Sequence, residues 1–232
     1  MNGKHFIRLK RDGGDSPGRW IVLYFVLILA AFVLNGCGGS NDESSGTLPV
    51  YVSDITSDIG ADGDIGLALD GTYTISSALD MGNILAGVDP VTGEEFRGFL
   101  DFPLRGVDGI PPDAVIESAT LEVYISGMSD SSPDRIYPFL IDLVAFQPPI
   151  LITDDFNRVA QPSLLTMPVD FYPSDVGNFV SIDLTALMDE AQMEELPDLQ
   201  LRFLLDFSET SGLIEIDDSD LETAPLLKVS YF

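Results

Sequence analysis

Short apolar segments with a two-residue period are the feature that most limits what this chain of 232 residues can fold into. Between Glu117 and Ile125, the residues Ala119, Leu121 and Val123 alternate with polar residues, so one side of an extended strand is apolar. The same alternation recurs at 199–206, 213–217 and 226–231, and further strands are predicted at Tyr73–Ser76, Arg97–Leu104, Tyr137–Phe146 and Phe179–Leu184. Strands with one polar face are typical of antiparallel sheets. The pattern predicts an all-β, jelly-roll-like antiparallel sandwich whose polar strand faces lie in water.

One short helix is expected beside these strands. Leu184, Leu187, Met188 and Ala191 follow the i, i+3, i+4, i+7 spacing of a helix with one apolar face, and Pro197 follows its expected end. A parallel α/β protein would instead show continuous apolar strands separated by regular helices.

A basic and then apolar leader precedes the strands. Trp20–Leu34 is an apolar run of about 15 residues, which suits the core of a signal peptide better than a bilayer-spanning helix of about 20. The next residues, Leu34-Asn35-Gly36-Cys37, have the form of a bacterial lipoprotein cleavage box, with a small residue before the cysteine. This predicts a signal helix and lipidation of Cys37; the alternative is an uncleaved membrane anchor with an incidental cysteine.

Cleavage before Cys37 sets the predicted organisation of the chain. Residues 1–36 would be the signal peptide, residues 37–49 a flexible polar tether, and residues 50–232 the sandwich domain. Acyl chains on Cys37 would hold the exported domain on a membrane. Gly38, where an aspartate is associated with inner-membrane retention, favours the outer membrane.

The charge of the chain excludes one class of partner. Five of the 11 Lys and Arg residues lie in the leader, so six remain beside 36 of the 38 Asp and Glu residues. Binding to nucleic acid needs Lys and Arg to replace counterions at phosphates, so nucleic acid is excluded as a partner. Cations, basic partners or simple solubility are the expected uses of the negative charge.

The residue types that are missing after the leader exclude several chemistries. The single His and the single Trp, His5 and Trp20, lie in the leader, and Cys37 is the only cysteine. Residues 38–232 therefore cannot supply a Ser-His-Asp triad, a Cys-His pair or a zinc site built from His or Cys. With no disulfide available, stability must come from a hydrophobic core. We expect a protein that is not an enzyme.

The order of several segments resembles the DNRLRE-type domain, a jelly-roll-like module of surface proteins related to carbohydrate-binding modules. The segments are Arg97-Gly-Phe-Leu-Asp-Phe102, the proline turn and strand at 110–121, the strand at 179–185, and the closing pair at 211–219 and 224–231. The resemblance covers roughly residues 60–232 and implies a non-catalytic binding or structural module. The family often has a tryptophan mid-domain, which the stretch 153–162 lacks.

Closely spaced aspartates give a candidate metal site. Asp58, Asp62 and Asp64 lie among glycines and could supply hard oxygen ligands to Ca²⁺, although their spacing differs from an EF-hand loop. The alternative is a solvated loop. The stretches 217–220 and 154–155 are further candidates, and the first of them is also expected to form a turn between the last two strands.

A surface tyrosine gives a candidate ligand contact. Alternation places Tyr124 on the polar face of its strand, where an aromatic ring could contact a sugar; plain packing is the alternative. The leading interpretation is a lipid-anchored envelope module that binds polysaccharide or a protein partner, with calcium as a candidate cofactor. A purely structural envelope lipoprotein is the rival, and a carboxylate-dependent hydrolase is a third hypothesis.

Overall fold

The computed structural model describes residues 49–106, 109–129, 135–145, 150–209 and 211–232. The predicted signal peptide, Cys37 and all but the last residue of the predicted tether lie outside the described residues. Within those residues, no helix is both long and apolar enough to cross a membrane.

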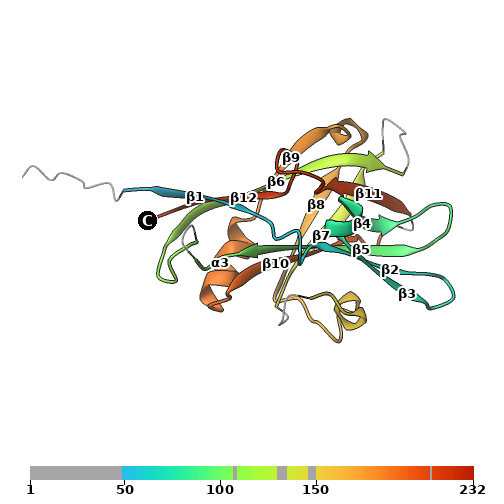
Figure 1. The fold of residues 1–232 in the computed structure, drawn as a ribbon, viewed down its shortest axis with the longest axis horizontal. Coiled ribbons are helices and arrows are strands. Elements are labelled where there is room, and N and C mark those ends of the chain that lie inside the picture. The colour runs from blue at the N-terminus through green and yellow to red at the C-terminus, as the bar shows by residue number, and fades with distance from the viewer. Residues whose placement is uncertain (1–48, 107–108, 130–134, 146–149, 210) are drawn as a thin grey trace, which may run out of the picture. The chain divides into compact units, whose positions relative to one another are not determined.

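The described residues form an antiparallel sheet of twelve strands that curls back on itself as a sandwich (Figure 1). This confirms the all-β prediction, and every strand predicted from the sequence is present. The strands are β1 (Tyr51–Thr56), β2 (Gly63–Leu67), β3 (Tyr73–Ser77), β4 (Asn83–Val88), β5 (Glu95–Pro103), β6 (Ile116–Met128), β7 (Tyr137–Val144), β8 (Leu165–Phe171), β9 (Asn178–Asp183), β10 (Asp198–Leu205), β11 (Gly212–Asp217) and β12 (Leu226–Tyr231).

The sheet has two halves that face each other across the core. One half has the order β1-β12-β6-β11-β4, with β9 along the other side of β6. The other half has the order β3-β2-β5-β10-β7-β8. The halves are joined where Gly87 and Val88 of β4 pair with Phe96 and Glu95 of β5.

Alternation along β6 explains how one half buries its inner face. Ala119, Leu121, Val123 and Ile125 have no exposed surface, whereas the residues between them are partly exposed. The main core lies between the halves, and its largest side chains include Phe102, Phe139, Phe171 and Phe203.

The predicted helix is present as α3 (Thr185–Met193). Leu187, Met188 and Ala191 are its buried face, and the Asp183 carboxylate accepts a hydrogen bond from the backbone N–H of Thr185 at 2.9 Å. Beyond this helix, the described residues contain a single-turn helix, α2 (Ala78–Met81), and two 3₁₀ turns, η1 (Thr153–Phe156) and η2 (Pro173–Asp175).

The expectation of a wet outer face on β10 is wrong. Gln200, Arg202 and Leu204 are at most 2% exposed, although they alternate with core residues. The segment 150–164 covers this face, where Phe156 packs into a small second core with Ile65, Phe99 and Val144. Alternation along a strand does not predict that a segment distant in the sequence will bury the strand's outer face.

A buried ion network holds this cover in place. Arg202 donates from Nε and Nη2 to Asp142 at 3.1 and 2.7 Å, and neither side chain has exposed surface. Arg158 and Thr166 donate to the other carboxylate oxygen of Asp142 at 2.9 and 2.6 Å. Arg202 also donates from Nη1 to the backbone carbonyl of Asp155 at 2.8 Å. Because Asp155 and Arg158 belong to the segment 150–164, these bonds fasten it to β7 and β10.

Candidate functional site

An aromatic pair lies on the outer face of the half-sheet that contains β6. Tyr124 of β6 stands directly opposite Phe179 of β9, and their rings meet edge to face with centroids 5.2 Å apart. Phe179 is 52% exposed and Tyr124 is partly exposed. The prediction that Tyr124 points away from the core is therefore confirmed, and the fold adds a second ring beside it.

Polar side chains continue along the same two strands. Glu122 stands opposite Ser181, two residues along the strands from the aromatic pair. With the rise per residue of an antiparallel strand, this distance is roughly 7 Å. Lys228 of β12 donates to Glu122 at 2.8 Å. We call Tyr124, Phe179, Glu122 and Ser181 the outer strip. It offers two ring surfaces next to hydroxyl and carboxylate groups that can form hydrogen bonds.

The three aspartates predicted as calcium ligands have different surroundings. Asp58 is exposed and accepts a hydrogen bond from the N–H of Gly60 at 3.0 Å. Asp62 and Asp64 are only 1% and 2% exposed, and they accept hydrogen bonds from backbone N–H groups of β5 and β4 at 2.7 and 3.1 Å. Across the described ranges, no group of three or more His, Cys, Asp or Glu side chains is placed to hold a metal. The structure does not gather these three carboxylates into one ligand set.

Asp62 instead lies beside Asp218, which comes from the turn between β11 and β12. Burial raises the pKa of Asp62 to about 9; Ser57 and the N–H of Asp101 favour its charged form, and the charges of Asp218 and Asp101 oppose it. Burial also raises the pKa of Asp218 to about 6, although the neighbouring Asp62 carboxyl lowers it and the charge of Asp217 raises it. The turn predicted at 217–220 is present, but its second residue is buried.

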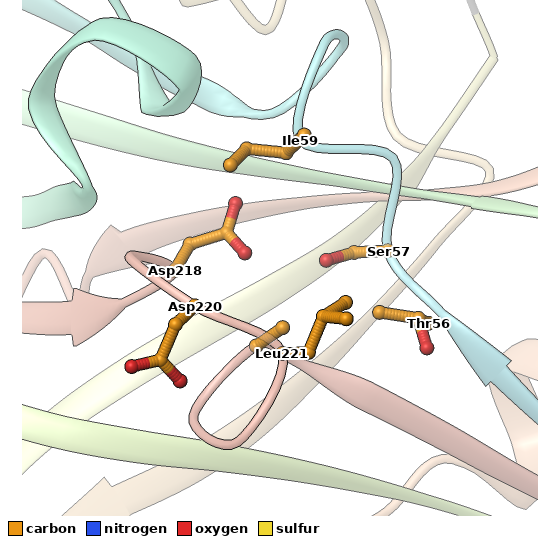
Figure 2. A pocket seen from close by; sticks show the side chains of 7 residues that line it. Thr56, Ser57, Ile59, Asp218, Asp220 and Leu221 are labelled. Atoms are coloured by element: carbon orange, nitrogen blue, oxygen red, sulfur yellow. The ribbon is translucent and has the colours of Figure 1, made fainter.

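A cavity of about 160 Å³ is lined by Asp218 and Ser57 but not by Asp62 (Figure 2). Ser57 and Asp218 point toward each other across it, whereas the carboxylate of Asp220 points away from Ser57. Ile59 and Leu221 supply apolar lining. Its walls are mostly apolar, and Ser57 and Asp218 lie at the end where the β1–β2 and β11–β12 connections meet.

Sequence reasoning missed Phe179 and Ser57 as members of these sites, and it named Asp218 only within the separate candidate stretch 217–220, not beside Asp62. Phe179 carries a usable signal, because it begins a predicted strand and is the aromatic residue next to the Gly177 turn. Ser57 carries no such signal, and its meeting with Asp218 depends on the pairing of β1 with β12.

Comparisons with known proteins give no family. No protein-family model matches the chain, and no curated protein matches its sequence significantly. The resemblance to the DNRLRE-type domain therefore stays a prediction, while the all-β sandwich stands on the structure itself.

Proposed function

We propose that this chain is a non-catalytic, lipid-anchored module of the bacterial cell envelope that binds an uncharged polysaccharide on its outer strip. The observation that carries the proposal is the pair of the partly exposed Tyr124 and the exposed Phe179, which stand opposite each other on neighbouring strands. The C–H face of a sugar ring packs on such rings, and its hydroxyl groups would bond to Glu122 and Ser181.

The charge of the protein supports an uncharged ligand. The formal net charge of the whole chain is −27, and Lys228, the basic residue next to the strip, is paired with Glu122. An acidic polysaccharide would meet a repulsive field with no unpaired cation to oppose it at the strip.

Affinity electrophoresis of the full chain in detergent, against a panel of uncharged, acidic and basic polysaccharides, tests this binding. We expect at least one uncharged polysaccharide to retard the protein, and Tyr124→Ala to remove most of the retardation. If no polysaccharide retards the protein, with or without Ca²⁺, the result contradicts the proposal and favours the rival role as a purely structural envelope lipoprotein.

The anchor has an independent test. Cells that express the chain and take up a palmitate analogue should label it, and Cys37→Ser should abolish the label because the sulfur and the new N-terminus both belong to that residue. Label that remains on the Cys37→Ser protein would exclude lipidation at this position. The predicted location on the outer membrane is checked by fractionation of the same cells.

A further inference from the structure

Asp62 and Asp218 form a buried pair of acids without a basic partner. Burying a carboxylate is unfavourable unless a proton or a cation compensates its charge. The six Lys and Arg residues after the leader all lie in the described part of the chain, and each makes a contact elsewhere. Arg97 contacts Glu95, Arg105 the carbonyl of Ile110, Arg135 the carbonyl of Ser211, Arg158 and Arg202 the carboxylate of Asp142, and Lys228 contacts Glu122. The charges that act on Asp62 are those of two other carboxylates, Asp218 and Asp101.

Three oxygen atoms around this pair have no hydrogen-bond partner. They are Oδ2 of Asp62, Oδ2 of Asp218 and Oγ of Ser57, and these residues are 1%, 2% and 9% exposed. Buried polar atoms in native proteins are nearly always bonded, so three such atoms in one place indicate a ligand. Carboxylate and hydroxyl oxygens are hard donors, which suit a hard cation.

We propose that a divalent cation of the calcium type binds between Asp62 and Asp218, with the hydroxyl of Ser57 as a third ligand. The site differs from the one predicted from the sequence, because it replaces Asp58 and Asp64 with residues that lie in two separate connections of the fold. It contains two acidic side chains and one hydroxyl, and so it does not belong to the metal sites built from three or more His, Cys, Asp or Glu side chains, none of which occurs among the described residues.

The cavity opens beside two of the three proposed ligands, Ser57 and Asp218. Ca²⁺ takes six to eight oxygen ligands, so water held at the Ser57 and Asp218 end of this mostly apolar cavity would have to supply the ligands that the protein does not. With two carboxylates, we expect weak affinity, with a dissociation constant on the order of 10⁻⁴ to 10⁻³ M. Because Ser57 and Asp62 precede β2 and Asp218 follows β11, the cation would join these two connections.

Thermal unfolding of the full chain, treated with EDTA and then returned to millimolar Ca²⁺, tests the site. Bound Ca²⁺ stabilises the folded state by mass action, and we expect the melting temperature to rise by about 1–6 °C over a NaCl sample of equal ionic strength. The NaCl sample accounts for screening of the large negative charge. Asp218→Asn should lose the rise, whereas Asp220→Asn, from the same turn but pointing away, should keep it.

A calorimetric titration with CaCl₂ keeps the proposal falsifiable if Asp218→Asn folds poorly. We expect one saturable site in the parent chain and an affinity weakened about tenfold or more in Ser57→Ala and Asp62→Asn. The proposal is overturned if the parent chain shows no saturable binding, or if its melting temperature in Ca²⁺ equals that in NaCl. It is overturned equally if Asp218→Asn gains as much as the parent. None of these readouts depends on polysaccharide binding.

Discussion

Replacing Asp142 by asparagine removes the charge that compensates Arg202 beneath the segment 150–164. In the native chain the Asp142 carboxylate accepts two bonds from Arg202, at 3.1 and 2.7 Å, and one each from Arg158 and Thr166. Arg202 has no exposed side-chain surface, so water cannot replace the lost charge. Breaking a buried pair by neutralising one partner costs about 3–5 kcal/mol. For a domain of this size, we expect the melting temperature to fall by about 6–20 °C.

Equilibrium unfolding in urea measures this loss, and a surface ion pair supplies the control. Glu122→Gln breaks the bond to Lys228 but should change the free energy of unfolding little, because both side chains contact water. A double-mutant cycle of Asp142→Asn with Arg202→Met should give a coupling free energy of about 2–3 kcal/mol. Once Asp142 is neutral, Arg202→Met costs little more, because it removes a buried arginine that has already lost its counter-charge. An Asp142→Asn protein that unfolds within about 1 kcal/mol of the parent would refute this account of the network.

Two further substitutions probe the sandwich and its cover. Gly87→Ala should lower the free energy of unfolding in urea by about 3 kcal/mol or more, because φ is 115° and a Cβ would collide with the carbonyl of Gly212. Gly71→Ala is the control: φ is 86° but the space around it is open, so the free energy of unfolding should fall by only about 1–2 kcal/mol. Equal losses at the two glycines would show that the collision is relieved. Phe156→Ala should cost about 3–5 kcal/mol and speed proteolytic cleavage within 150–164, because the side chain is 4% exposed and packs on Tyr73 and Arg97. An unchanged cleavage rate would show that the cover does not depend on this side chain.

Local patterns in the sequence were sufficient to predict the strands that alternate cleanly. β6 and β12 have apolar residues at every second position and were predicted with the correct inward face. The strands β1, β2, β4 and β8 were not predicted. In β2 and β4, Gly63, Gly66 and Gly87 interrupt the alternation where the backbone passes close to neighbouring strands. The glycines that make close packing possible also remove the apolar signal.

For the outer strip and the Asp62–Asp218 pair, the sequence predicts individual residues but not which residues lie next to one another. Tyr124 was placed on the outer face from its strand alone, but its pairing with Phe179 depends on the register between β6 and β9. The sequence predicts calcium ligands both at Asp58, Asp62 and Asp64 and at 217–220, but it does not show that Asp62 and Asp218 lie together. That meeting follows from antiparallel pairing of the first strand with the last, which joins segments far apart in the chain.

Titration of an uncharged polysaccharide that retards the parent protein, carried out on the outer-strip variants, tests the central proposal most directly. The double variant Tyr124→Ala/Phe179→Ala should weaken binding by about tenfold or more, because each lost ring removes stacking of about 1 kcal/mol. Tyr51→Ala is the matched control, because Tyr51 is 55% exposed and stacks on Tyr231 at the far edge of the same half-sheet. The account predicts parental affinity for Tyr51→Ala and a large loss for the double variant. Equal affinity in all three proteins would contradict it.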